Sequence, residues 1–183
     1  AATTSELNTI QAGIEANGAS GALTYTKLTG TATSLAANTD DIIDGVAVTV
    51  DESGAASTYA TVAQIDTLTT RVAAVSNASL SYEKLNDSAT NLAAGDTSYL
   101  AGIAITIDDT NNAAATATEL NTIQQKMGQS GSVTYAKLRD SASVLVTNIA
   151  DIVAGVAVTI DETGNNVAAT VAELNSRQTQ VAS

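Results

Sequence analysis

Apolar residues along the chain follow two alternating patterns, one with helical spacing and one with the two-residue period of a strand. Val46, Val48 and Val50 alternate with Ala47 and Thr49, which predicts a strand with one apolar face. Apolar residues spaced as on one side of a helix form three clusters: Leu7, Ile10 and Ile14; Ile65, Leu68 and Val72; and Leu120, Ile123 and Met127. Each cluster predicts a helix that buries these residues.

Polar residues predict where the helices begin and end. Each longer helix is expected to start with a capping box, in which Thr and a Glu or Gln three residues later satisfy each other's backbone N–H groups. The predicted boxes are Thr3 and Glu6, Thr61 and Gln64, Thr116 and Glu119, and Thr170 and Glu173. Shorter helices are predicted around Leu35, Leu92 and Leu145, with Asp87-Ser88 and Asp140-Ser141 as N-terminal caps and Asn38, Gly95 and Asn148 near the C-terminal ends.

These patterns recur as a tandem repeat. Tyrosine and glycine recur at the same intervals of 57 and 53 residues, at Tyr25, Tyr82 and Tyr135 and at Gly45, Gly102 and Gly155. We predict units at 1–54, 55–112 and 113–165, and a partial fourth unit at 166–183. Helix and strand alternate regularly, which predicts an α/β repeat solenoid with parallel strands on one side and short helices on the other. One sheet or two could hold the two kinds of strand.

The repeat resembles a known group of proteins. The pattern of residues 61–65 and 86–94, together with the strands after the three recurrent glycines, is similar to repeats of very large surface proteins from cyanobacteria and other aquatic bacteria. These are often grouped with haemolysin-type calcium-binding, adhesin-like and S-layer-like proteins. The resemblance covers nearly the whole chain. It implies an extracellular or cell-surface location and a structural or adhesive role.

Composition excludes several functions. The 183 residues include no Cys, His, Phe, Trp or Pro, so the core must be built from small aliphatic side chains. The net charge of −12 argues against nucleic acid and against anionic lipid as partners. No apolar run of about 20 residues predicts a transmembrane helix. Because histidine and cysteine are absent and no nucleophile or phosphate-binding motif occurs, we expect no enzymatic activity.

Two adjacent acidic residues follow the apolar strand in each block, namely Asp51 and Glu52, Asp108 and Asp109, and Asp161 and Glu162. Stacked in register, these residues would form a ladder of carboxylates, and Ca²⁺ prefers such oxygen ligands. Alternatively they form turns and cap the next helix. Both interpretations stay open, so calcium is a candidate ligand. A second acidic group, Asp40, Asp41 and Asp44 with counterparts Asp96 and Asp151, is interpreted as a solvated loop rather than a catalytic pair.

Tyrosine and lysine form a second recurrent pattern. Each recurrent tyrosine is followed two residues later by a lysine, at Lys27, Lys84 and Lys137, and both are expected on one strand face. They could form a ligand-binding stripe. The interpretation we favour places the tyrosine ring at the edge of the core with its hydroxyl in water, while the lysine extends to solvent.

The strand face opposite the apolar one carries hydroxyl residues. Thr24, Thr49, Ser81, Thr106, Thr134 and Thr159 are candidates for a flat interaction face. Such a face suits lateral self-association, binding to ice or a surface glycan, or simple solvation. We therefore expect a structural protein of an extracellular filament, surface layer or adhesin. Its expected partners are further copies of itself or further repeats of a longer chain, and a surface-binding module for ice or glycan is the alternative.

Overall fold

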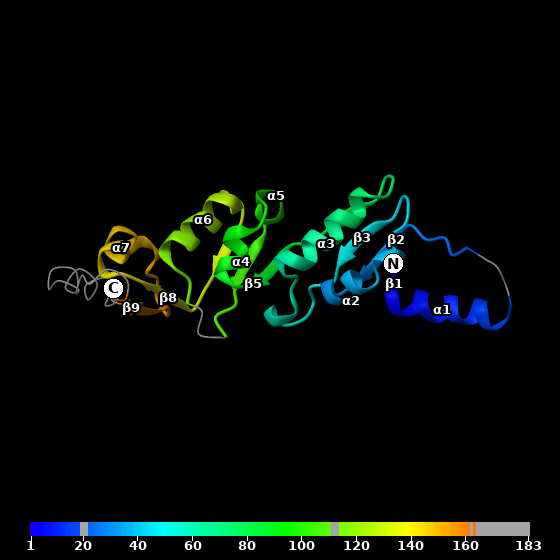
Figure 1. Ribbon diagram of the computed structural model, residues 1–183, viewed down its shortest axis with the longest axis horizontal. Helices are drawn as coiled ribbons and strands as arrows, with labels where there is room; N and C mark the ends of the chain where they lie inside the picture. The colour runs from blue at the N-terminus through cyan, green and yellow to red at the C-terminus, as the bar shows by residue number, and fades with distance from the viewer. Residues whose placement is uncertain (19–21, 111–113, 162, 164–183) are drawn as a thin grey trace. The chain divides into compact units, whose positions relative to one another are not determined.

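The computed structural model describes residues 1–18, 22–110, 114–161 and 163, and it is a mixed α/β structure (Figure 1). The described residues form seven α-helices and nine short strands, and the strands make three sheets. The chain divides into two compact units, Ala1–Asn86 and Asp87–Ser183. This division falls inside the second predicted repeat, within strand β5.

In the first unit, helices and strands alternate along the chain. The strands are β1 (Ala2–Thr3), β2 (Lys27–Gly30), β3 (Ala47–Val50) and β4 (Ser79–Ser81). The helices are α1 (Thr4–Ala16), α2 (Ala32–Ala37) and α3 (Val62–Ala73), with short 3₁₀ turns at Thr39–Asp41 and Ala56–Thr58. The four strands pair in chain order as one parallel sheet. The two kinds of predicted strand therefore share a single sheet here.

The second unit repeats this alternation. Its strands are β6 (Ala104–Ile107), β7 (Ser132–Thr134), β8 (Lys137–Asp140) and β9 (Ala157–Ile160), and β5 spans Lys84–Asp87. Its helices are α4 (Ala89–Ala94), α5 (Thr97–Leu100), α6 (Ala117–Met127) and α7 (Ala142–Thr147), followed by a 3₁₀ turn at Ile149–Asp151. The sheets are β5-β6-β7 and β8-β9, and the described pairings of β6 with β7 and of β8 with β9 are parallel.

The predicted helix caps are confirmed wherever the structure describes them. Capping boxes with both reciprocal hydrogen bonds begin α1, α3 and α6. Ser88 and Ser141 cap α4 and α7, and Thr31 caps α2 in the same way. The helix ends at Asn38, Gly95 and Asn148 also match the prediction. The predicted box at Thr170 and Glu173 lies outside the described residues.

One face of each sheet is buried beneath helices. In the first unit Leu28, Val46 and Val48 are fully buried, as are Leu35 of α2 and Ile65 of α3, whereas Thr49 on the opposite face is exposed. Leu85, near the end of the first unit, is buried like Leu28. In the second unit Ile105 of the strand and Leu92, Leu120 and Leu145 of the helices are buried as well. The predicted alternation of the apolar strands is confirmed in these residues.

Ile10 is a correction to the predicted helix cores. It was expected to be buried on α1, but 49% of its surface is exposed. The corresponding residues Leu68 of α3 and Ile123 of α6 are fully buried. α1 contacts α2 through Thr4 and Asn8. Leu68 lies between Gln64 and Arg71, which contact the preceding short helix α2 and the turn just after it, whereas among the described residues no short helix precedes α1 to cover Ile10.

The backbone conformation explains why glycine recurs at these three positions. Gly45, Gly102 and Gly155 have φ angles of 77°, 74° and 86°, just before strands β3, β6 and β9. Side chains with a Cβ rarely adopt this conformation, whereas glycine does so at little cost. The turn into each apolar strand therefore requires glycine, which explains the spacing seen in the sequence.

Candidate functional site

The first acid of each acidic pair forms a local turn. The Oδ1 atom of Asp51 accepts a hydrogen bond from the Ser53 backbone N–H at 3.0 Å. Asp108 and Asp161 accept equivalent bonds from the N–H groups of Thr110 and Thr163, at 2.9 and 3.0 Å. The hydroxyl and then the N–H of the residue two positions later lower the pKa of each of these three carboxyl groups. The turn-forming interpretation is confirmed for these residues.

The second acid reaches much farther along the chain. The Glu52 carboxylate accepts from the backbone N–H of Glu83 at 3.0 Å and from that of Lys84 at 2.9 Å. Asp109 accepts from the N–H groups of Ala136 and Lys137, at 2.8 and 3.0 Å. The prediction that these acids cap the next helix is therefore wrong: they bind the start of a later strand instead.

These carboxylates accept hydrogen bonds from backbone N–H groups just before and at the first residue of β5 and β8. Such charge-assisted hydrogen bonds are stronger than neutral ones. Sequence spacing could have suggested them, because Glu52 and Asp109 occupy the same position in their blocks. The sequence could not identify the N–H groups that these carboxylates bind, because those groups lie 27 to 32 residues away in the chain. The third counterpart, Glu162, lies outside the described residues.

Calcium stays a prediction for the acidic pairs. Within the described ranges, no three Asp or Glu side chains converge in a way that could hold a metal ion. The described carboxylates instead accept N–H groups, as above. A melting temperature that rises on adding calcium and falls with chelator would support calcium binding by the pairs at 51–52, 108–109 and 161–162.

The loop acids differ in environment. Asp44 accepts from the Ser76 N–H at 3.0 Å, and Asp96 caps α5 through the Ser98 N–H at 2.8 Å. Burial raises the pKa of Asp41, and the charge of Asp40 adds to this effect. Burial also raises the pKa of Asp151. Asp151 is 9% exposed, so the interpretation of this group as a solvated loop is wrong for that residue.

The tyrosines lie beside strands rather than within them. Tyr82 lies between β4 and β5 and Tyr135 between β7 and β8, whereas Lys84 and Lys137 begin β5 and β8. Tyr25 likewise precedes β2. The predicted common strand position is therefore wrong, because the chain breaks its strand pairing at the tyrosine.

The tyrosine hydroxyls bind backbone rather than water. Tyr25 donates to the carbonyl oxygen of Asp41, and Tyr135 donates to that of Asp151. Burial raises the pKa of both phenols, and the charges of the two aspartates add to it. The prediction of hydroxyls in water is thus corrected for these two tyrosines, although their place at the edge of the core is confirmed by partial burial.

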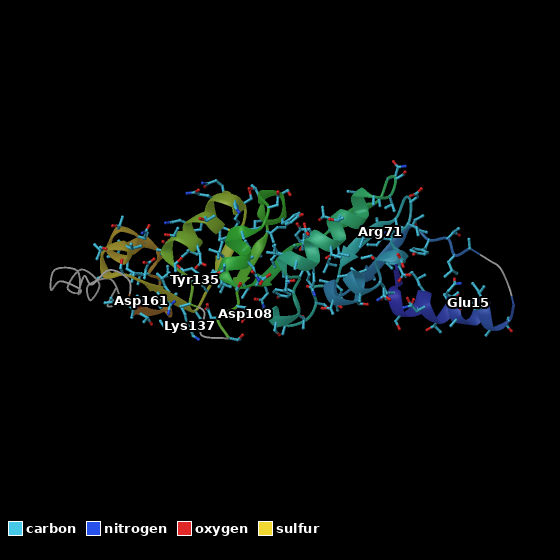
Figure 2. All side chains as sticks on the ribbon, in the orientation of Figure 1. Glu15, Arg71, Asp108, Tyr135, Lys137 and Asp161 are labelled. Carbon is cyan, nitrogen blue, oxygen red and sulfur yellow. The ribbon has the colours of Figure 1, made fainter. Side chains whose placement is uncertain are left out.

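The lysines also make internal contacts. The ammonium group of Lys84 lies 4.9 Å from the centre of the Tyr59 ring. The Lys137 ammonium donates to the Asp109 carbonyl at 2.9 Å. Figure 2 labels Lys137, which begins β8, and Tyr135, which comes two residues before it. These contacts favour the interpretation that tyrosine and lysine hold the strand entrance rather than a ligand.

The hydroxyl residues form a row in the first unit. Thr3, Thr29, Thr49 and Ser81 are register partners on the four neighbouring strands. Thr24 was predicted beside Thr49, but Thr29 takes that place, because β2 begins only at Lys27. We call the exposed face that carries this row the hydroxyl face.

In the second unit the hydroxyl pattern is interrupted. Thr106 and Thr134 are partners across β6 and β7, as predicted. Thr159 instead pairs with Arg139, whose Nε lies 3.6 Å from a carboxylate oxygen of Asp161. A guanidinium group thus replaces a hydroxyl in the β8-β9 sheet.

Comparison with family models, with curated proteins and with solved structures finds no match to this chain. The structure adds one finding about the membrane: in the parts of the chain that it describes, every helix is too short or too polar to cross a bilayer.

Proposed function

We propose that this chain is a non-catalytic structural repeat protein, an α/β solenoid that contributes to an extracellular filament, surface layer or adhesin. It would act by end-to-end or lateral self-association. Calcium is proposed only as an additional stabilising ligand of the acidic pairs. The observation that carries the proposal is a pairing register that recurs at equivalent residues.

The register recurs three times at the strand that follows each recurrent tyrosine. Ala2 pairs with Leu28, Ala60 with Leu85, and Ala115 with Leu138, all in parallel. On the other side of two of these strands, Leu28 pairs with Val48 and Leu138 with Val158. Repeats that share one register can add copies without changing the interface, and this supports a repeat solenoid in which length grows with copy number.

Contacts between helices recur in the same way. The capping-box residue of the longer helix also binds the preceding short helix, as Gln64 to Thr33 at 2.9 Å and Glu119 to Thr90 at 2.7 Å. A hydrogen bond between side-chain amides joins Asn8 to Asn38 and, two predicted units later, Asn121 to Asn148. Each of these bonds uses one residue that also caps a helix. Every repeat therefore contains residues that bind its long helix to a neighbouring short helix.

The location is proposed from the resemblance and from charge. An excess of 12 negative charges favours solubility in salty surroundings. A structural role also agrees with the absence of histidine and cysteine from the whole sequence, since these are the commonest catalytic base and the strongest thiol nucleophile.

The test is whether the purified chain assembles. Negative-stain electron microscopy over a range of protein concentrations should show filaments or sheets, and chains with residues 55–112 duplicated should lengthen by a constant increment in small-angle scattering. Single particles at every concentration would contradict self-association. A duplicated chain that grew as a compact globule would contradict the solenoid.

A surface-binding module is the second candidate, and the hydroxyl face favours it. An open hollow on this face combines hydroxyl, carboxylate and ammonium groups, which suit sugar hydroxyls or ordered water. It is lined by Thr29, Thr49, Val50, Asp51, Glu52, Ser81, Tyr82, Glu83 and Lys84. Glycan arrays and thermal hysteresis separate the two ligands. Thr49→Glu should abolish either activity, whereas Thr67→Glu on the exposed side of α3 should not.

A further inference from the structure

Two carboxylates bind the same backbone position in two different units. The position consists of the two N–H groups just before and at the start of the strand that follows a recurrent tyrosine, and the N···O distances are 2.8 to 3.0 Å. The pairs are Glu52 with Glu83 and Lys84, and Asp109 with Ala136 and Lys137. Because the side chains before the lysines differ, the backbone makes this position bind a carboxylate.

The strand that carries each of these acids also pairs with the segment before the tyrosine. β3, which ends shortly before Glu52, pairs with Ser79–Ser81 of β4. β6, which ends shortly before Asp109, pairs with Ser132–Thr134 of β7 in the same parallel register. A strand with an acidic end is therefore held twice, by its backbone and by its carboxylate.

The first unit has both features without a partner. Residues 22–24 are the counterparts of Ser79–Ser81 by their spacing from the recurrent tyrosine, yet they form no strand (Figure 1). Thr26 and Lys27 are the counterparts of the two N–H donors, and within the described ranges no carboxylate accepts from them. Lys27 is exposed, whereas the lysines at the same position of the other units are partly buried.

The rest of this region matches the other units. Leu28 is buried and pairs with Ala2, as Leu85 pairs with Ala60. The Tyr25 hydroxyl donates to a backbone carbonyl, as the tyrosine of the third unit does. The first unit thus holds a backbone edge that is already positioned for a strand and a carboxylate.

We propose that residues 22–27 bind a strand that ends in an acidic pair, of the kind formed by residues 47–52. The strand would pair in parallel with residues 22–24, and its second acid would accept from the N–H groups of Thr26 and Lys27. The Lys27 ammonium adds a positive charge beside the carboxylate, as the Lys137 ammonium lies against Asp109. Backbone pairing supplies affinity in such an arrangement, and the charge-assisted bonds select the acidic strand.

The ligand chemistry rests on the recurrent register of the proposed solenoid, and it does not require that the strand belong to a second copy. The test is an amide chemical-shift titration of the full 183-residue chain with a capped peptide of residues 46–53. The amide signals of Ala22, Thr26 and Lys27 should shift and exchange more slowly with solvent, because each gains an acceptor, as the Ser79 N–H has the Val46 carbonyl.

The equivalent amides of the other units are internal controls. Those at positions 83–84 and 136–137 should not move, since carboxylates of the chain already occupy them. An absence of shifts at residues 22–27, or shifts confined to other residues, would overturn the proposal.

A peptide with the Glu52→Gln substitution is the matched control for the carboxylate. Its binding should be roughly fivefold weaker, because a neutral oxygen replaces a charged acceptor. In the chain, Lys27→Gln should weaken binding of the acidic peptide and Lys27→Arg should retain it. Lys27 is exposed, so the melting temperature should stay constant. Equal affinities for the two peptides would exclude recognition of the carboxylate.

Two further arms identify the source of the carboxylate. If acetate at the same concentration reproduces the shifts, any carboxylate suffices and the recognition of a strand is wrong. If the same amides shift with the concentration of the chain alone, the acidic strand comes from a second copy, which supports this site and the proposed self-association together.

The site and the proposed function can fail separately. Peptide binding by a chain that stays monomeric at every concentration would support the site and contradict self-association. Filaments that form although the peptide leaves residues 22–27 unchanged would support self-association and overturn the site.

Discussion

Glu52 and Asp109 occupy the same position in two units, yet they hold the following strand differently. Glu52 is partly exposed and uses both carboxylate oxygens to accept from Glu83 and Lys84. Asp109 is 9% exposed and uses Oδ2 alone to accept from Ala136 and Lys137. Its Oδ1 is buried without a hydrogen-bond partner.

The difference in burial between the two carboxylates follows from the one additional methylene group in the glutamate side chain. The longer glutamate can reach the N–H groups from the surface and stay partly hydrated. The shorter aspartate reaches them only when the whole carboxylate is buried, which costs solvation of its second oxygen. The position therefore requires a carboxylate within reach of two N–H groups, and the length of the acid decides how deeply it lies.

The largest effect is expected when each acid is removed. Asp109→Ala should lower the free energy of unfolding by about 3 kcal/mol, because the part-buried N–H groups of Ala136 and Lys137 lose a charged acceptor. Glu52→Ala should cost about half of that, roughly 1.5 kcal/mol, because water can reach the freed N–H groups. Urea unfolding measures both values. Equal losses would show that burial does not distinguish the two acids.

Tyr135→Phe tests whether the Tyr135 hydroxyl stabilises the segment at 135–137, whose backbone N–H groups also bind Asp109. Removing the hydroxyl should cost about 1 kcal/mol, since the Asp151 carbonyl loses its donor. Combined with Asp109→Ala, the loss should be less than additive, because both groups hold the same segment. Strict additivity in urea unfolding would mean that the two contacts act independently.

The same variant predicts a pH dependence. Burial, with the charge of Asp151, raises the pKa of Tyr135, so the folded state holds the phenol proton more tightly than the unfolded state does. That contribution to stability is complete below the ordinary tyrosine pKa of about 10 and is lost as pH rises through the raised value. The stability gap between the unsubstituted chain and Tyr135→Phe should therefore narrow at strongly alkaline pH.

Exchanging the length of the acid sharpens the comparison at smaller magnitude. Glu52→Asp should cost about 0.5–1 kcal/mol, because an aspartate cannot reach both N–H groups without being drawn inward. Gly54→Ala is not a suitable control, since its Cβ would meet the Thr58 hydroxyl at 2.4 Å. Ser53→Ala in the same turn is the matched control. A Glu52→Asp variant as stable as the unsubstituted chain would contradict the argument from length.

The smallest effect is expected at the first acid of each pair. The pKa of Asp108 is lowered by the Thr110 hydroxyl and N–H, so its contribution is present above the ordinary pKa of 3.8 and lost as pH falls through the lowered value. Asp108→Asn should therefore reduce the melting temperature slightly at pH 7 and leave it unchanged near pH 2. Equal reductions at both pH values would exclude a role for the charge.

Local features were predictable because they depend on neighbouring residues alone. The capping boxes at Thr3, Thr61 and Thr116 and the buried alternation of Val46, Val48 and Val50 follow from contacts within a few positions. Features set by distant pairing were missed. The recurrent sequence predicts Tyr82 within a strand, but the pairing of β4 with β3 ends at Ser81.

The sequence by itself determined the repeat intervals, the helix caps, the apolar strands after the recurrent glycines and the glycine turns, since each depends on local backbone preference and side-chain spacing. Only the tertiary structure decided which strands pair, that Thr29 rather than Thr24 lies beside Thr49, and that Ile10 is uncovered while Leu68 is buried. The physical reason is that pairing and burial belong to two segments at once. The sequence of one segment does not specify which distant segment will pack against it.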